Sequence, residues 1–279
     1  MMSYGLKIFL SVAECGSVTE TANELFVTQP AVSKAIKTLE DKLSLKLFHR
    51  DKRKGLTLTD AGRKIFLLAR QMRDLEERMY QTAFRENNCL GGTLRIASVP
   101  IATTLILSKI LRRYREKFPA VNVELKEGTP ADIRRMLETY AADFAITYSP
   151  FGNFDSEILI DDEMVGIGCD ENFVTLRDGV EGLIFCRAGF EVVRKIFNIN
   201  AEKNFVVQNA ETVVKLVEAG NGVGIMSKLV LSATGGRVSV CRVEPPIKTQ
   251  LGLAAHDLHD LPPSAAEFIR LIKISEELP

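Results

Sequence analysis

The residues of this chain that could do chemistry do not form a recognisable catalytic constellation. The three histidines, His49, His256 and His259, belong to no HExxH motif and have no triad-like neighbours. The glycine-rich run 220–224 follows a predicted helix and precedes a predicted strand, whereas a dinucleotide-binding fingerprint requires the reverse order. We therefore expect that the protein is not an enzyme, and the sequence predicts neither a cofactor nor a metal site.

The cysteines are widely scattered, odd in number and without CxxC spacing. They are Cys15, Cys89, Cys169, Cys186 and Cys241. This pattern disfavours a zinc cluster and a disulfide scaffold, and it fits a reducing compartment. Scattered buried cysteines are the commoner case, but a redox switch formed by Cys169 and Cys186 stays open as an alternative.

Length and composition favour a globular chain with two domains. The 279 residues suffice for two domains of ordinary size, and 46% apolar with 26% charged residues excludes a disordered or fibrous chain. No apolar run is long enough for a membrane-spanning helix. The N-terminus has no basic region ahead of an apolar core, as a signal peptide would have. We expect a cytoplasmic protein without a membrane partner.

The formal net charge of zero hides an asymmetry along the chain. Residues 1–89 hold 15 basic and 11 acidic residues, whereas residues 90–279 hold 21 and 25. Within residues 34–64 the counts are 10 basic and 4 acidic. Such an excess is typical of a surface that contacts phosphates, although a solvated basic face would have the same composition.

Three short amphipathic helices and a hairpin are predicted in the first 58 residues. Gly16 would end the first helix, and Ser17-Val18-Thr19-Glu20 is a capping box that opens the second. Thr28 would cap the third helix, which exposes amide, hydroxyl and ammonium groups near its start. The basic run 49–55 lies between two short strands, as in a wing along the DNA backbone. This order indicates a winged helix-turn-helix, although a generic three-helix bundle has the same apolar spacing.

Several short stretches of this region together form a sequence motif. They are Phe9–Glu14, Gly16-Ser17, Ala22–Leu25, Thr28–Lys34, Leu39-Glu40, Leu47-Phe48 and Leu58–Gly62. In this order and spacing they resemble the winged helix-turn-helix of LysR-type transcriptional regulators. The resemblance implies a sequence-specific DNA-binding regulator that binds double-stranded DNA.

The resemblance also implies which side chains contact DNA. The recognition helix and its cap would contribute Thr28, Gln29, Pro30, Ser33, Lys34 and Lys37, and the wing Arg50 and Arg53. We expect Ser33 and Lys34 to contact bases, and Arg50 and Arg53 to anchor phosphates. Lys34 stands where many members carry arginine, and an ammonium makes a point contact where a guanidinium makes a two-pronged one.

Apolar residues in 59–88 follow a heptad spacing. The seam consists of Ile65, Leu68, Met72, Leu75 and Met79. Because the rest of the segment is strongly charged, the seam should bury against a second copy of the chain, unless it packs on domains of its own chain. In the LysR-type family this segment is the linker helix that dimerises the protein. A homotetramer through the C-terminal domains is a further expectation.

Strands and helices alternate after residue 92, which implies a mostly parallel sheet with crossover helices. Strands are predicted at 93–97, 121–125, 144–148, 163–168, 183–185, 205–207, 222–226 and 250–255. Helices are predicted near 103–117, 130–140, 211–219, 227–233 and 263–277.

Further stretches of this part resemble the effector-binding domain of LysR-type regulators. They are Gly92–Ile96, Glu127–Thr129, Ala142–Ile146 and Val217–Met226. The resemblance implies a multidomain α plus α/β protein, whose effector domain is two-lobed and similar to type 2 periplasmic solute-binding proteins. The expected domains are a winged helix-turn-helix (1–58), a linker helix (59–89) and an effector domain (90–279). Lobe I would span about 90–160 and 253–279, and lobe II about 161–252.

Ligands of α/β lobes bind at the C-terminal ends of strands, where helix N-termini offer free N–H groups. The residues expected there are Ser98, Pro100, Ile101, Thr103, Thr129, Tyr148, Gln208 and Asn209. Each of them alone would also suit a helix cap. Helix N-termini favour an anionic ligand, and Pro100 with Ile101 favours an aromatic or aliphatic acid.

The sequence thus predicts a cytoplasmic transcriptional regulator modulated by a small organic effector bound between two lobes. The expected partners are double-stranded DNA, the effector and further copies of the chain in a homodimer or homotetramer, with RNA polymerase as another candidate. Two alternatives remain, a regulator that senses redox state through Cys169 and Cys186, and a solute-binding protein without a regulatory role.

Overall fold

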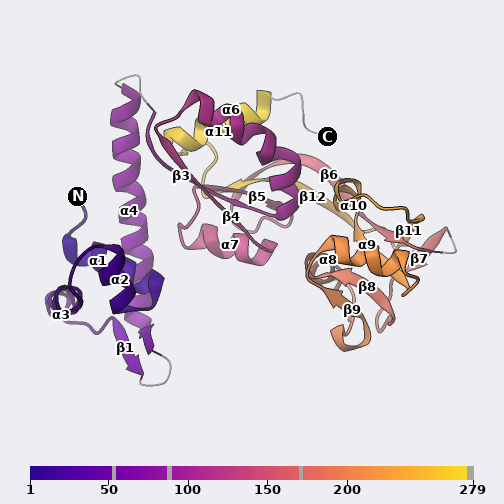
Figure 1. The fold of residues 1–279 in the computed structure, drawn as a ribbon, viewed down its shortest axis with the longest axis horizontal. Helices are drawn as coiled ribbons and strands as arrows, with labels where there is room; N and C mark the ends of the chain where they lie inside the picture. Colours follow the sequence, from indigo (N-terminus) through magenta and orange to yellow (C-terminus); the bar gives the residue numbers. More distant parts are fainter. Residues whose placement is uncertain (52–54, 87–89, 170–171, 275–279) are drawn as a thin grey trace. The chain divides into compact units, whose positions relative to one another are not determined.

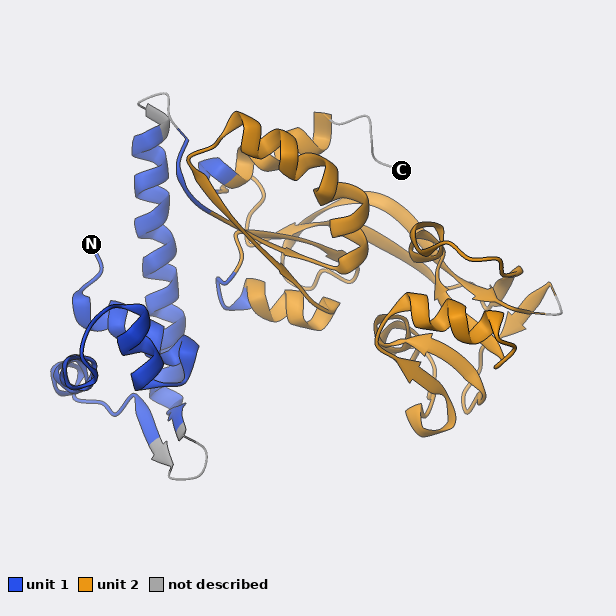
Figure 2. Ribbon diagram, viewed as in Figure 1, with its two compact units in different colours: residues 1–93, 138–141, 262–264 blue, residues 94–137, 142–261, 265–279 orange. Residues whose placement is uncertain are grey.

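The computed structural model describes residues 1–51, 55–86, 90–169 and 172–274, and their side chains except those of residues 50, 51, 55, 85 and 86. The chain divides into two compact units (Figure 2). Unit 1 comprises Met1–Thr93 with residues 138–141 and 262–264, and unit 2 comprises the rest. None of the helices in the described part of the chain is long and apolar enough to span a membrane.

Unit 1 begins with three helices around an apolar core. They are α1 (Tyr4–Cys15), α2 (Val18–Glu24) and α3 (Gln29–Leu43). Residues at helical spacing are directed inward, so that Phe9 and Val12 of α1 and Val32 of α3 are completely buried. The three predicted helices are confirmed.

Local capping decides where these helices begin and end. Gly16 ends α1 in the left-handed region at φ 71°, which glycine adopts without a Cβ penalty. The Ser17 hydroxyl accepts a hydrogen bond from the Glu20 amide at 3.2 Å, as the predicted cap requires. Thr28 is the N-cap residue of α3, as predicted, but its side chain makes no cap hydrogen bond. A proline in the first turn of α3 favours a helical start without it.

A hairpin and a long helix complete unit 1. Strand β1 (Phe48–Asp51) pairs antiparallel with β2 (Gly55–Leu58), which confirms the predicted hairpin. Helix α4 (Asp60–Glu86) follows directly and has 27 residues, which corresponds to a length of about 40 Å.

The start of α4 is tied to the segment that enters the hairpin. The Thr59 hydroxyl donates to the Lys46 carbonyl at 2.7 Å and accepts from the Gly62 amide at 2.8 Å. A Cβ at Gly62 would overlap the Leu47 carbonyl oxygen, so this close approach of two backbones requires glycine.

Unit 2 is built on a sheet whose main order is β4-β3-β5-β12-β6-β10-β8-β9, with β11 beside β6 and β7 beside β11 (Figure 1). The strands are β3 (Gly92–Ser98), β4 (Val121–Glu127), β5 (Phe144–Tyr148), β6 (Asp155–Ile167), β7 (Phe173–Thr175), β8 (Leu183–Cys186), β9 (Phe205–Val207), β10 (Val223–Ser227), β11 (Val240–Glu244) and β12 (Lys248–Ala255).

The helices of unit 2 cover this sheet. They are α5 (Pro100–Ala102), α6 (Ser108–Lys117), α7 (Pro130–Glu138), α8 (Arg187–Val193), α9 (Ala210–Glu218), α10 (Lys228–Thr234) and α11 (Pro263–Ile274). A π-helical turn, η1 (Thr103–Leu107), joins α5 to α6, and a 3₁₀ turn, η2 (Ala201–Lys203), precedes β9.

The sheet serves two lobes that share one strand. In lobe I, β6 pairs with β12 from Asp155 to Glu163, and in lobe II it pairs with β10 and β11 from Met164 to Ile167. Lobe I has an aromatic core in which the Phe268 ring lies 4.9 Å from Tyr114 and 5.7 Å from Phe144, measured between centroids. Lobe II has separate cores, so each lobe is stabilised by its own buried side chains.

The structure corrects three expectations for this part. The sheet is mixed and not mostly parallel, because β12 and β6 run antiparallel to their neighbours where the chain crosses between the lobes. The first half of β6 was missed because its side chains are largely exposed. Strands β7 and β11 and helix α8 were not predicted, although buried and exposed residues alternate along β11 as in an ordinary strand.

Candidate functional site

Six of the eight residues predicted to contact DNA lie on α3 or at its N-cap. Thr28, Gln29, Pro30, Lys34 and Lys37 are exposed and Ser33 is half-buried. The opposite face of the helix is buried in the core. Neither lysine has an ion-pair or hydrogen-bond partner among the described residues, so both ammonium groups are available to phosphates or bases.

A groove of about 650 Å³ runs between α3 and the hairpin. It is lined by Val18, Gln29, Ser33, Lys34, Ile36, Lys37, Glu40, Lys46, Phe48 and Leu56. The groove therefore brings together four of the predicted contact residues and the base of the predicted wing.

One residue in this groove holds the hairpin against α3 and was missed by the sequence analysis. Glu40 is buried, and its carboxylate accepts from the Lys46 ammonium at 2.7 Å and from the Leu47 amide at 2.9 Å. Burial opposes ionisation of Glu40, but these hydrogen bonds outweigh it and hold the pKa of the carboxyl below its usual value. Its partners lie six and seven positions later, beyond the end of α3, so helical spacing gave no signal for this pairing.

The structure covers the predicted wing only in part. Arg50 lies on β1, where its backbone pairs with Leu56, but its side chain is not among those that the structure describes. Arg53 lies outside the described residues altogether.

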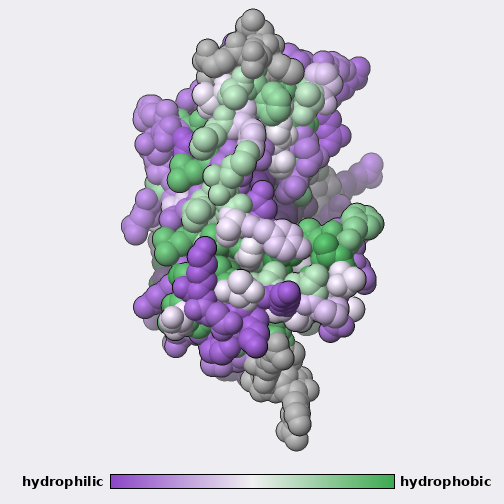
Figure 3. All heavy atoms as spheres, turned by 90° about the vertical axis from the view of Figure 1, so that its left-hand side faces the viewer, coloured by the Kyte–Doolittle hydropathy of each residue, from purple (hydrophilic) through white to green (hydrophobic). Residues whose placement is uncertain are grey.

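Helix α4 carries an exposed apolar stripe. Exposed fractions are 56% for Leu68, 46% for Met72, 57% for Leu75 and 71% for Met79. Figure 3 shows apolar surface running down this side of unit 1 from its upper end. Ile65, the first seam residue, packs instead against the core of α1 and α3, so the exposed seam begins at Leu68.

Two predicted ligand contacts in lobe I are already engaged within the chain. Ser98 is buried and its hydroxyl donates to the Val99 carbonyl at 3.0 Å. The Thr129 hydroxyl donates to the Asp132 carboxylate at 2.7 Å, and the Thr129 amide donates to the same carboxylate at 3.2 Å. These two hydrogen bonds lower the pKa of Asp132 and close a capping box at the start of α7.

Thr103 differs from these residues. Its Oγ1 is buried and has no hydrogen-bond partner among the described residues. It begins the π-helical turn η1, and π-helical turns inside α-helices are frequent at functional sites. Ile101, two residues earlier, is buried, and Pro100 is exposed. Thr103 therefore carries a buried hydroxyl that no group of the described residues satisfies.

The predicted residues of lobe II lie at the start of α9. The Asn209 side chain accepts from the Thr212 amide at 2.9 Å and from its hydroxyl at 2.7 Å, so it caps the helix. Gln208 is exposed.

Tyr148 joins an interlobe cluster that the sequence analysis did not predict. Its hydroxyl donates to the buried Asp162 carboxylate at 2.9 Å and lies 3.2 Å from the Ser227 hydroxyl. The same carboxylate accepts from the Ser227 hydroxyl and from the Leu229 amide at 3.1 Å. Burial raises the pKa of Tyr148, so the phenol stays a donor. The cluster connects β5 of lobe I with the N-terminus of α10 in lobe II.

A cleft of about 830 Å³ lies beside this cluster, where the strands cross between the lobes. Its lining residues are Ser149, Ile160, Asp161, Asp162, Glu163, Lys228, Leu229, Ser232, Lys248, Thr249 and Gln250. Thr249 is buried and its hydroxyl has no hydrogen-bond partner among the described residues. None of the predicted ligand contacts lines this cleft itself, although Tyr148 is hydrogen-bonded to Asp162, which does.

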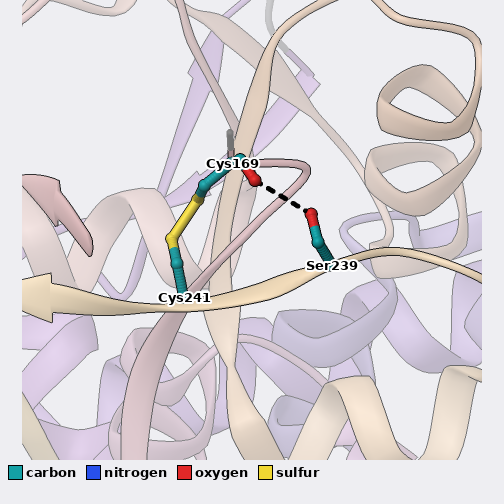
Figure 4. Close-up of a disulfide and its surroundings, with 3 residues drawn as sticks. All are labelled: Cys169, Ser239 and Cys241. Carbon is teal, nitrogen blue, oxygen red and sulfur yellow. Dashed lines mark hydrogen bonds between the residues drawn. A yellow bond between two sulfur atoms is a disulfide. The ribbon is translucent and has the colours of Figure 1, made fainter. Parts of the chain in front are cut away.

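The cysteines of lobe II pair differently from the alternative considered above. Cys169 forms a disulfide with Cys241, and Cys186 is a buried free thiol (Figure 4). Burial raises the pKa of Cys186, whose sulfur accepts from the Gly189 amide at 3.4 Å. The predicted Cys169–Cys186 switch is therefore wrong, because Cys241 on β11 lies beside Cys169. No group of three or more potential metal ligands occurs within the described ranges.

Comparison with protein families covers both units. Residues 4–63 match the bacterial regulatory helix-turn-helix protein, lysR family, and residues 88–275 match the LysR substrate binding domain. Over 279 residues the chain is 39% identical to the HTH-type transcriptional regulator YoaU of Bacillus subtilis (strain 168), with 96% of each chain covered. It is 29% identical to YvbU of the same organism, again with 96% of each covered.

Solved structures agree in fold. A full-length OxyR variant from Pseudomonas aeruginosa has a TM-score of 0.70 at 19% identity, covering 100% of this chain and 97% of that one. Full-length CbnR complexed with its target DNA has a TM-score of 0.57 at 17% identity, covering 98% and 99%.

Proposed function

Since the chain belongs to the LysR family and is a DNA-binding transcriptional regulator with an effector-binding domain, we propose how its own residues divide this work. The observation that carries the DNA-binding part is the exposed polar face of α3, on which Lys34 and Lys37 lack partners among the described residues. Ser33 and Lys34 contact base edges, Gln29 and Lys37 support them, and Arg50 and Arg53 anchor phosphates.

Binding titrations on matched and mutated operator DNA test this division. Ser33→Ala or Lys34→Ala reduces discrimination at one base pair by about 1–3 kcal/mol. Arg53→Ala weakens binding to all sequences alike and lowers the salt dependence by about one unit of slope. Lys42→Ala, on the last turn of the same helix, is the control and leaves discrimination unchanged. Equal loss of discrimination from Lys34→Ala and Arg53→Ala would contradict the proposal.

We infer that the chain is a homodimer through α4. The exposed stripe from Leu68 to Met79 supports this, because a helix so charged elsewhere gains stability by burying its apolar side. Leu75→Lys would place an unpaired charge in the buried seam and dissociate the dimer. Leu67→Lys adds the same charge to an exposed leucine outside the heptad register and serves as the control. Sedimentation of the full chain distinguishes the two variants. A Leu75→Lys protein that stays dimeric would refute dimerisation through this seam.

For the effector, we propose a small organic acid with an apolar body, bound near Thr103. The buried Thr103 hydroxyl without a partner supports this site, and Ile101 suits an apolar group. A thermal-shift screen of aromatic and aliphatic carboxylates tests it, since a ligand at 100 times its dissociation constant stabilises the protein by about 2.7 kcal/mol.

The matched variants for this screen are neighbours in one helix. Thr103→Val abolishes the shift, whereas Thr104→Val leaves it intact, because Thr104 is exposed and its hydroxyl already donates to the Pro100 carbonyl at 3.1 Å. A full shift in Thr103→Val would place the ligand elsewhere. A tetramer through the effector domains, contact with RNA polymerase, absence of catalytic activity and a cytoplasmic location complete the proposal.

A further inference from the structure

The disulfide of lobe II joins two strands that already lie side by side. Cys169 follows the end of β6, and Cys241 on β11 pairs with Gly166 of β6. Their Cα atoms are 6.2 Å apart although 72 positions separate them in the sequence. Next to the bond, the Ser239 hydroxyl donates to the Cys169 carbonyl at 3.1 Å (Figure 4).

The space for the two sulfur atoms comes from a missing side chain. A Cβ at Gly166 would lie 2.5 Å from the Cys241 Sγ and 3.0 Å from the Cys169 Sγ. Because a Cβ does not tolerate such distances, glycine at this position lets the two sulfurs approach one another across the strand pair.

The pair is also accessible to small molecules. Cys169 is half-buried, and Cys241, although buried at 5% exposure, helps to line a cleft of about 830 Å³. Glu163 and Lys228 also line this cleft. A low-molecular-weight thiol can therefore reach the bond without unfolding of the lobe.

A regulator that acts on DNA is exposed to the thiol systems that keep most cysteines reduced, and disulfides in such proteins are commonly transient or redox-sensing. We propose that Cys169 and Cys241 form a reversible two-electron redox site whose substrates are low-molecular-weight thiols and disulfides. This site is independent of the effector site proposed above.

The chemistry is thiol–disulfide exchange. A small thiolate attacks one sulfur of the pair, forms a mixed disulfide and releases the other cysteine as a thiolate, which takes up a proton. A second small thiolate attacks the mixed disulfide and releases the remaining cysteine. Two small thiols are thereby oxidised to one disulfide, and the protein disulfide is reduced to two thiols. A small disulfide drives the reverse reaction.

Reduction has a local structural consequence. Strand β11 is held to β6 by three residue pairs and in turn carries β7 at its other side. Loss of the cross-link removes a covalent restraint on these two strands. The cleft beside the pair shares Glu163 and Lys228 with the cleft at the crossing strands, so the restrained strands border the region between the lobes.

The full-length protein, equilibrated with reduced and oxidised glutathione at ratios from about 1 to 10⁴, tests the proposal. Alkylation and mass spectrometry measure the redox state of Cys169 and Cys241, and amide hydrogen exchange measures protection of residues 240–244. The pair converts from disulfide to dithiol within this range, and exchange in 240–244 rises at least about tenfold on reduction.

Two variants complete the experiment. Cys186→Ser, which removes the buried free thiol, behaves like the unchanged protein. Cys169→Ser shows the faster exchange in both buffers. A pair that stays oxidised at every ratio, a pair that never oxidises, or exchange that ignores its redox state would each overturn the proposal. None of these results bears on DNA binding by α3.

Discussion

The face of α3 that we propose contacts DNA and the predicted ligand contacts of unit 2 differ in what their polar side chains do. On α3 the polar groups are exposed, and two ammonium groups have no partner among the described residues. In unit 2 most of the predicted contacts already bond to their own chain, as Ser98, Thr129 and Asn209 do. Of the buried polar groups that stand out there, the Asp162 carboxylate accepts from the Leu229 amide, 67 positions away, and the Thr103 hydroxyl has no hydrogen-bond partner among the described residues.

The difference follows from the geometry of the two sites. The side chains with which a recognition helix contacts DNA all come from one continuous stretch of sequence, where they recur at helical spacing. A cleft between lobes is assembled from strand ends and helix starts that are far apart in the chain, and its residue types also serve as caps. Four predictions test how far this contrast extends.

The largest effect is expected at the interlobe cluster. Asp162→Ala removes the acceptor of four hydrogen bonds, from Tyr148, Ser227, Leu229 and the Glu163 amide. Donors left buried without partners are costly, so the free energy of unfolding of unit 2 should fall by about 3–4 kcal/mol. Asp162→Asn keeps part of the acceptor capacity and should lose about half as much. Denaturant unfolding measures both, and a loss below about 1 kcal/mol for Asp162→Ala would show that water replaces the carboxylate.

The next effect concerns Glu40 in unit 1. Glu40→Gln weakens the charged hydrogen bonds to Lys46 and Leu47 and should destabilise the unit by about 2 kcal/mol. Because the pKa of Glu40 is lowered in the folded state, its stabilisation is present above the unfolded value, about pH 4.3, and is lost as the pH falls through the folded value. Thermal unfolding of the unchanged and substituted proteins between pH 3 and 7, about the range of this titration, measures the difference. If the stability of the two proteins changed with pH in the same way, the predicted contribution of Glu40 would be contradicted.

A smaller effect separates capping from ligand binding in lobe II. Asn209→Ala removes the cap of α9 and should destabilise unit 2 by about 1 kcal/mol. It should leave the ligand-induced thermal shift unchanged, because the side chain is engaged by Thr212. Loss of the shift without loss of stability would instead make Asn209 a ligand contact.

The smallest effects compare two caps in unit 1. Ser17→Ala should cost about 1 kcal/mol, since its hydroxyl accepts from Glu20. Thr28→Ala should change stability by only a few tenths of a kcal/mol, because Thr28 makes no cap hydrogen bond. If Thr28 contacts DNA, its substitution weakens DNA binding with stability intact. Chemical unfolding and DNA titration of the two variants, side by side, measure this.

Sequence patterns predicted unit 1 better than unit 2 for physical reasons. The caps and periodicity of α1 to α3 are local, and Gly16 and Ser17 act within one turn of where they lie. The role of Glu40 depends on Lys46 and Leu47 beyond the helix end, and that of Asp162 on Ser227, 65 positions away. The same separation explains why Cys186 was considered as a partner for Cys169, while Cys241 on the unpredicted β11 is the actual one.

The shared strand β6 gives the effector unit an elastic property. The lobes are connected by a continuous strand of 13 residues and by its neighbour β12, whose register shifts between Leu251 and Gly252. A Cβ at Gly252 would lie 2.6 Å from the Glu157 carbonyl oxygen, so the two backbones are in close contact there. A change of the angle between the lobes bends these two paired strands elastically. Part of the binding free energy of a ligand that alters the angle is therefore stored as bending, and it restores the original angle when the ligand leaves.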